Sequence, residues 1–271
     1  MTCTRLQVRD LLPVDVEKYL QRIGAERPTG TGRADLAALH AAHPRAVPFE
    51  DYDIHLGIPL SLELDDLEDK VVTRRRGGFC YELNGLFAEL LRELGFAVTL
   101  HSAFELGPDG GPGPGFEHLR LVVQTDDGPH LADVGNGAAW TAPVPLVPGT
   151  HGGTQVHRDG DLWWASRRTH EGHWEREWTW TGRPRELAEF LPRCRYQEHD
   201  PDSNFVNRRL AALATADGKV SVVNGVLKET AGDRQTERAL DPDGERAVLA
   251  ERFGITLPAG RAWKEPAAGQ P

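Results

Sequence analysis

Cys80 is the first of three side chains in this 271-residue sequence whose types and order suit nucleophilic catalysis. It follows the run Arg74-Arg75-Arg76-Gly77-Gly78-Phe79 and opens an apolar stretch with helical spacing. Helix N–H groups and nearby guanidinium groups both favour thiolate over thiol, and thiolate is the nucleophilic form. The two glycines could bring N–H donors close to a developing oxyanion. The segment predicts an activated cysteine, and a small buried residue after a tight turn is the alternative interpretation.

His118 and Asp133 are the candidate base and orienting acid for that cysteine. His118 begins one strand-like run, and Asp133 lies in the next, beyond an Asp126-Asp127-Gly128 turn. A hairpin of this kind brings an imidazole and a carboxylate near each other. Either residue alone would be interpreted as an ordinary strand residue. Together with Cys80 they form a Cys, His, Asp set of the kind that hydrolase triads use.

The composition restricts the class of protein. The chain carries 31 Lys and Arg against 41 Asp and Glu, a formal net charge of −10. This balance argues against a nucleic-acid or membrane-surface binder, because phosphate binding needs clustered cations. No apolar run approaches the roughly 20 residues of a membrane span, no secretory signal is visible, and three cysteines cannot all pair. We expect a cytoplasmic enzyme with neither a nucleic-acid nor a membrane partner, and the abundant Arg, Ala, Gly and Pro are typical of a bacterial genome.

The elements that must position these residues change character at Gly95. Helical patterns come first, at Val14–Ile23, at Ala34–His40 and, most clearly, from Cys80 to Leu94. The apolar period then shortens to about two, which predicts strands. The expected later elements are strands at Ala97–Phe104, His118–Thr125, His130–Val134 and Asp161–Ser166, a helical piece at Pro184–Leu191, a strand pair at Leu210–Ala214 and Lys219–Leu227, and a last helix at Pro242–Phe253. The Gly- and Pro-rich segment Leu106–Phe116 predicts a mobile loop.

With these motifs in their order, the sequence resembles the arylamine N-acetyltransferase family. The matching stretches are Val47-Pro48-Phe49-Glu50, Arg76-Gly77-Gly78-Phe79-Cys80-Tyr81-Glu82-Leu83-Asn84, Glu117-His118-Leu119-Arg120-Leu121, Leu131-Ala132-Asp133-Val134-Gly135, and Cys194-Arg195-Tyr196 with Pro201-Asp202-Ser203-Asn204-Phe205. The resemblance implies an α+β, cysteine-protease-like fold of three domains. These would be an N-terminal helical bundle over residues 1–95, a central β-barrel over 96–200 and a C-terminal α/β lid over 201–271.

The resemblance also implies the chemistry. Cys80 would accept an acetyl group from acetyl-CoA, His118 would activate the thiol, and Asp133 would orient His118. An aromatic amine or hydrazine would then take the acetyl group in a ping-pong cycle. Acetyl-CoA would be a co-substrate, with no bound cofactor and no metal.

Further site residues follow from the same resemblance. Phe49, Phe79 and Phe205 are expected to line an apolar substrate pocket, although ordinary core aromatics remain the alternative. Glu50 and Arg76 are expected to support the site as an ion pair. Arg74 and Arg75 could face CoA phosphates, but a solvated basic edge is favoured.

The sequence departs from the family pattern near the expected site. Asp51 stands where Asn is usual, and Asn136 stands where an aromatic residue is usual. Asn136 predicts a roomier or more polar substrate pocket. The segment Ala138-Ala139-Trp140 replaces a glycine-rich continuation, which puts CoA contact there in doubt, and residues 196–200 also differ.

These departures keep two alternatives open. One is an amide synthase of secondary metabolism, which would take a polyketide thioester from an acyl carrier protein and close an aryl amide or macrolactam with the same three residues. The other is an inactive binding protein that retains the fold. An intact Cys, His, Asp set argues against the second alternative.

Overall fold

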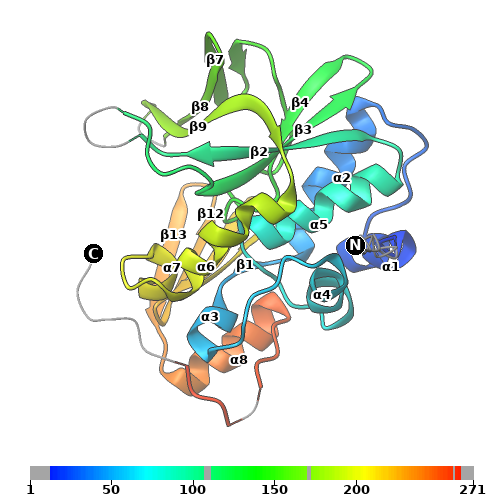
Figure 1. The fold of residues 1–271 in the computed structure, drawn as a ribbon. Helices are drawn as coiled ribbons and strands as arrows, with labels where there is room; N and C mark the ends of the chain where they lie inside the picture. The colour runs from blue at the N-terminus through cyan, green and yellow to red at the C-terminus, as the bar shows by residue number, and fades with distance from the viewer. Residues whose placement is uncertain (1–12, 107–110, 170–171, 259, 264–271) are drawn as a thin grey trace, which may run out of the picture.

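The computed structural model describes residues 13–106, 111–169, 172–258 and 260–263, and it combines helices with two antiparallel sheets (Figure 1). The N-terminal part is helical, with α1 (Val16–Ile23), α2 (Arg33–Ala46), α3 (Tyr52–Leu56), α4 (Leu64–Glu68), the π-helical turn η1 (Asp69–Thr73) and α5 (Cys80–Glu93). Helix α1 begins two residues after its predicted start, and α2 begins one residue before its predicted start. The buried face of α5 carries Leu83, Leu86, Phe87 and Leu90, as the spacing predicts.

An eight-stranded, nearly closed sheet covers α5, which packs against β2 and β3. The strand order is β5-β4-β3-β2-β9-β8-β7-β6. The strands are β2 (Ala97–Phe104), β3 (His118–Thr125), β4 (Gly128–Ala132), β5 (Val144–Pro145), β6 (Gly149–His151), β7 (Thr154–Asp159), β8 (Leu162–Arg168) and β9 (Trp174–Arg185).

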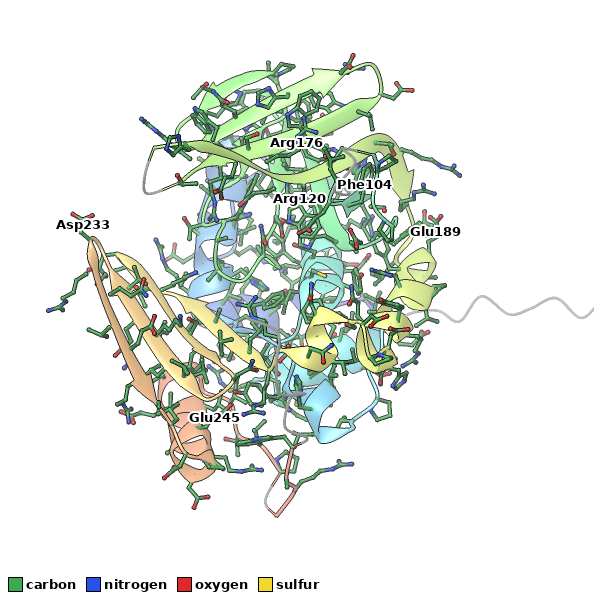
Figure 2. The ribbon with its side chains drawn as sticks, turned by 90° about the vertical axis from the view of Figure 1, so that its left-hand side faces the viewer. Phe104, Arg120, Arg176, Glu189, Asp233 and Glu245 are labelled. Carbon is green, nitrogen blue, oxygen red and sulfur yellow. The ribbon has the colours of Figure 1, made fainter. Side chains whose placement is uncertain are left out.

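A second sheet combines one strand from the N-terminal part of the chain with four from the C-terminal part. Its order is β1-β10-β11-β12-β13, with β1 (Phe49–Glu50), β10 (Leu210–Ala214), β11 (Gly218–Val223), β12 (Val226–Ala231) and β13 (Arg234–Ala239). Phe49 pairs with Ala212, so the N-terminal part supplies an edge strand to the C-terminal sheet. Helix α8 (Pro242–Phe253) contacts β10 and completes a separate apolar core. Figure 2 shows this sheet beside the helices and below the larger sheet.

A short helical connection links the two sheets and differs from the prediction. The helix expected at Pro184–Leu191 is wrong for its first residues, because β9 continues through Arg185 and pairs with β2. The connection then forms a 3-10 turn η2 (Leu187–Phe190), helix α6 (Leu191–His199) and the short α7 (Asn204–Asn207). Pro192 near the start of α6 suits a helix N-terminus, where its missing N–H is not needed.

Two other strand predictions needed correction. The single strand expected at Lys219–Leu227 is two strands, because Asn224 and Gly225 both take positive φ values, 47° and 77°, and turn the chain back. The strand expected at His130–Val134 is β4, which begins earlier and ends at Ala132. Part of the Leu106–Phe116 loop, residues 107–110, lies outside the described residues. The three domain boundaries stay predictions.

In the described segments, no helix combines the length and the apolar character that crossing a membrane would need.

Candidate active site

Cys80 is the first residue of α5, and the chain around it is held tightly. Phe79 is extended at the helix N-cap, and its N–H donates to the Glu82 carboxylate at 3.0 Å. A Cβ at Gly77 would lie 1.9 Å from the Pro48 carbonyl oxygen, so only glycine fits there. Gly78 donates its N–H to that same carbonyl group at 3.3 Å. The glycines therefore dock the helix start on the chain before β1, and the Gly78 N–H is not left free for an oxyanion.

Two of the three arginines before Cys80 form ion pairs elsewhere, contrary to the expectation that they favour its thiolate. Arg74 pairs with Asp69 at the surface, and Arg76 is buried against Glu50. Burial raises the pKa of the Cys80 thiol well above its ordinary value, and the Asp133 charge raises it further. Ionisation of this cysteine therefore depends on a nearby group that can take its proton.

His118 and Asp133 are brought together by the β3–β4 hairpin. The register pairs Leu121 with Ala132, which places the start of β3 beside the residue after β4. His118 Nε2 lies 2.7 Å from Asp133 Oδ2, so Nδ1 is the ring nitrogen that this contact does not use, and His118 lines the same cavity as Cys80. Burial by itself would raise the pKa of Asp133, but the contacts with His118, Arg120 and Asn84 outweigh it and lower that pKa to about 2. The carboxylate is charged over the whole physiological range.

Two residues that the sequence analysis gave no role hold this pair in place. Asn84, one turn beyond Cys80, donates to the Leu119 carbonyl at 2.7 Å and to Asp133 Oδ1 at 2.9 Å. Trp178 on β9 stacks on the His118 ring, with centroids 4.7 Å apart and planes 13° apart. Asn84 is part of the motif around Cys80, so the motif marks its importance, whereas nothing local to Trp178 indicates its partner.

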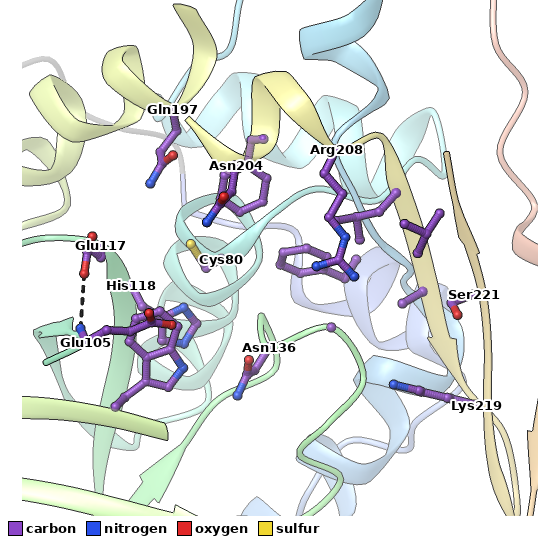
Figure 3. Close-up of a pocket in the computed structure, with 17 residues that line it drawn as sticks. Cys80, Glu105, Glu117, His118, Asn136, Gln197, Asn204, Arg208, Lys219 and Ser221 are labelled. Carbon is purple, nitrogen blue, oxygen red and sulfur yellow. Dashed lines mark hydrogen bonds between the residues drawn. The ribbon is translucent and has the colours of Figure 1, made fainter. Parts of the chain in front are cut away.

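A cavity of about 330 Å³ opens over Cys80 and His118 (Figure 3). Phe49, Asn136 and Phe205 line it, with the Phe49 and Phe205 centroids 6.3 Å apart. Phe79 is not among the lining residues; it is buried and packs edge-on against Phe205 at 5.3 Å. It therefore supports the cavity wall from behind. The substrate-binding roles of these four residues stay predictions.

The cavity has opposite charges on its two sides. Glu105 and Glu117 lie beside His118, with the Glu105 N–H donating to Glu117 Oε2 at 3.1 Å. Arg208 and Lys219 lie across the cavity, on the side of the five-stranded sheet (Figure 3). Cys80 lies between the two sides, so a ligand above its thiol meets an acidic wall, in which Glu117 also pairs with Arg193 at 3.1 Å, and a basic wall.

Glu50 and Arg76 form a buried ion pair below the site. Arg76 Nε donates to Glu50 Oε1 at 2.8 Å, and its NH2 group donates to Asp53 at 2.8 Å. Lys70 joins the network through Asp53 and Glu82, at 2.8 and 2.7 Å. These contacts fix η1, β1 and the first turn of α5 relative to one another, and they reach Cys80 only through the backbone. Within the part of the chain that the structure describes, no three His, Cys, Asp or Glu side chains are grouped to hold a metal ion.

Known proteins resemble this chain over most of its length. A family model described as N-acetyltransferase matches residues 34–262. An arylamine N-acetyltransferase of Mycolicibacterium smegmatis is 36% identical over 261 residues, which cover 91% of this chain and 94% of that protein. The solved structure of an M. smegmatis arylamine N-acetyltransferase has a TM-score of 0.83 at 33% identity and covers 91% of this chain and 95% of its own. That of the Mycobacterium marinum enzyme in complex with CoA has a TM-score of 0.81 at 29% identity, with 89% and 93% covered.

These likenesses define the class of protein, which is an acyltransferase. The chain belongs to the arylamine N-acetyltransferase family, and the family predicted from the motifs is confirmed. The solved relatives also confirm the predicted fold class.

Proposed function

We propose that this protein transfers an acetyl group from acetyl-CoA to an aromatic amine or hydrazine through an acetyl-Cys80 intermediate. The observation that carries the proposal is that His118, which lines the same cavity as Cys80, contacts the buried Asp133 carboxylate at 2.7 Å. Family membership supports the reaction type, and the name of the CoA complex of the M. marinum relative supports the donor.

Each of the three residues has a defined part in the two half-reactions. His118 takes the proton of Cys80, and the thiolate attacks the acetyl thioester carbonyl. The tetrahedral intermediate collapses, CoA leaves as a thiol with the proton from His118, and acetyl-Cys80 remains. The amine then attacks this thioester, His118 takes the amine proton and returns it to the sulfur, and the amide leaves. Asp133 stabilises the imidazolium form of His118 in both steps.

The basic wall of the cavity suits the donor. Arg208 and Lys219 provide two cations opposite the acidic wall, and CoA carries phosphate groups that such cations bind. Arg74 and Arg75 lie outside the set of residues that line the cavity. We assign the phosphate contacts to Arg208 and Lys219 rather than to the arginines before Cys80.

The acceptor would enter above Cys80 and lie against Phe49 and Phe205. An aromatic ring fits these side chains, and its amine would meet the acetyl group beside His118. Asn136 adds an amide to the same space, which admits acceptors with a polar ring substituent.

Intact-protein mass spectrometry tests the proposal. The protein is mixed with acetyl-CoA alone, and the expected result is one added acetyl group, about 42 Da, that is absent in Cys80→Ala. Addition of aniline or phenylhydrazine should remove the label and release the acetylated product. A folded protein whose Cys80 reacts with iodoacetamide but gains no acetyl group would overturn the proposal.

The amide-synthase alternative has no support from the relatives named above, which are arylamine N-acetyltransferases. It would require a carrier-bound donor, and no observation favours such a partner. The alternative of an inactive binding protein has no support either, because the chain belongs to a family of acyltransferases.

A further inference from the structure

Arg120 is a completely buried arginine that contacts the same carboxylate as His118. It lies two residues after His118 on β3, so both side chains leave the strand on one face. Arg120 Nε lies 3.1 Å from Asp133 Oδ2, the oxygen atom that His118 Nε2 approaches to 2.7 Å. One buried carboxylate oxygen is therefore shared by a histidine and a guanidinium group.

The guanidinium group of Arg120 occupies a site built for it. Its carbon lies 4.5 Å from the centroid of the Trp140 ring and 5.6 Å from that of Trp180. On the side away from Asp133, its NH2 group lies 3.6 Å from Glu177 Oε2. Trp140 Nε1 donates to that same oxygen at 2.8 Å. Four side chains thus surround a charge that is costly to bury, and they hold it by ion-pair and ring contacts, since its nitrogen atoms form no well-aligned hydrogen bond to any described residue.

Arg120 stays cationic in this position. Burial lowers the pKa of its guanidinium group, but Asp133 and Glu177 both oppose that shift. An arginine starts from so high a pKa that it keeps its proton. The positive charge therefore acts on Asp133 at every pH at which the protein folds.

The positive charge of Arg120 beside Asp133 weakens the stabilisation that this carboxylate gives to protonated His118. Asp133 stabilises a protonated His118 by its negative charge, and Arg120 offsets part of that charge from the other side. Trp140 belongs to the segment Ala138-Ala139-Trp140 that departs from the family pattern. Trp140, a residue of that segment, therefore forms one wall of the site that holds the Arg120 guanidinium group.

We propose that Arg120 is a positioning residue of the site, which orients Asp133 and limits how strongly that carboxylate holds a proton on His118. Its effect reaches the reacting atoms through Asp133 and His118. The inference rests on the proposed function for the roles of Cys80 and His118.

The test is the pH dependence of Cys80 alkylation by iodoacetamide, followed by intact mass with Cys80→Ala as the blank. This reaction needs neither acetyl-CoA nor an amine, so its outcome is independent of whether acetyl transfer occurs. Arg120→Leu removes a positive charge, and the acid limb of the profile should move to higher pH by about one unit. The direction is the same whether Cys80 or His118 loses the proton, because removal of a cation strengthens proton binding at both.

Glu177→Gln is the second variant and predicts a shift of the opposite sign. It removes the negative charge on the far side of Arg120, so the acid limb should move to lower pH, by less than in Arg120→Leu. It also keeps the test decisive if Arg120→Leu does not fold. Arg120→Lys keeps the charge and should keep the wild-type midpoint. Arg167→Gln is the matched control, since Arg167 contacts Glu177 at 2.9 Å from a half-exposed position.

Opposite shifts in Arg120→Leu and Glu177→Gln, with Arg167→Gln unmoved, would support the inference. A midpoint that stays at the wild-type pH in folded Glu177→Gln and in folded Arg120→Leu would overturn it, and Arg120 would then be a structural residue only. If Arg120→Leu does not fold, a wild-type pH midpoint of Cys80 alkylation in Glu177→Gln is enough to overturn the inference.

Discussion

Asn84 and Asp133 join the helix that carries the cysteine to the hairpin that carries the histidine, through an Nδ2 to Oδ1 contact of 2.9 Å. The same amide donates to the Leu119 carbonyl, and its oxygen accepts the Val134 N–H at 2.9 Å. One buried side chain on α5 thus fixes both strands of the hairpin. Because Cys80 is one turn earlier on α5, these contacts set the distance between the thiol and the imidazole.

Asn84→Ala should therefore damage stability and catalysis together. The change leaves the Leu119 carbonyl group and the Val134 N–H buried without this partner, at about 1–3 kcal/mol for each, and it removes one of the two donors to Asp133 Oδ1, where the Gly135 N–H remains. We expect the free energy of unfolding in urea to fall by about 3 kcal/mol and acetylation of Cys80 to slow at least tenfold. Ser61→Ala is the control: it removes hydrogen bonds to Asp66 and from the Glu63 N–H far from the site, and it should leave the acetylation rate unchanged. Wild-type acetylation rates in Asn84→Ala would contradict the positioning role.

Trp178 should contribute to the rate more than to stability. Its indole ring stacks on His118 from a half-buried position, so it restricts the imidazole without filling the core. We expect Trp178→Ala to slow acetylation by about tenfold, because an imidazole held by Asp133 alone is less often aligned. Trp178→Phe retains an aromatic face and should stay within about threefold of wild type. Stopped-flow acetylation and thermal unfolding measure the two effects, and equal rates in the Ala and Phe variants would argue against stacking.

The basic wall formed by Arg208 and Lys219 predicts that its loss weakens the binding of acetyl-CoA but not that of a donor without phosphate groups. Lys219→Ala and Arg208→Ala should each raise the KM for acetyl-CoA by about tenfold, as expected for the loss of one charge-assisted contact to a phosphate group. The effect should shrink at high salt. The donor 4-nitrophenyl acetate has no phosphate, so its KM should not change. Lys228→Ala is the matched control, since Lys228 is on the same sheet but pairs with Glu237 at 2.9 Å. A similar loss with both donors would place the two cations in another role.

The sequence predicts the elements of this protein wherever the pattern is local. The α5 helix follows from its leucine spacing, and β3, β10 and α8 have the bounds that alternation and capping residues indicate. The long-range pairing of Phe49 with Ala212 has no local signal, and neither does the continuation of β9 through Arg185. Both features depend on a neighbouring strand that is distant in the sequence, so the local pattern of residues does not contain them.

The candidate site divides in the same way. Cys80, His118 and Asp133 follow from residue type and order, but the charge around them does not. Three arginines before a cysteine suggest a basic environment, yet the structure places them in ion pairs or away from the cavity. The arginine that contacts Asp133, Arg120, is flanked by apolar residues on its strand. Two tryptophans and a glutamate more distant in the sequence surround its guanidinium group.

Asp51 is an acid that the protein buries at the position where the resemblance predicts Asn. Its Oδ1 accepts the Leu210 N–H at 2.8 Å, which ties the start of α3 to β10, while Oδ2 is buried without a hydrogen-bond partner. Burial raises the pKa of Asp51 well above its ordinary value, although the Leu210 contact lowers it in part. A protonated carboxyl group is neutral and has nearly the shape of the amide that it replaces.

Asp51→Asn should therefore stabilise the protein in a manner that depends on pH. Since the pKa is raised in the folded state, the stability that Asp51 contributes is fully present below the unfolded pKa of about 4 and is lost as pH rises through the folded pKa. The amide does not titrate, so the variant and wild type should have similar free energies of unfolding near pH 4. At pH 8 the variant should be the more stable of the two, because the unfolded wild-type chain is ionised there whereas burial opposes ionisation of Asp51 in the folded protein. Urea unfolding at both pH values measures this, and an advantage equal at pH 4 and pH 8 would mean that Asp51 is ionised in the folded protein.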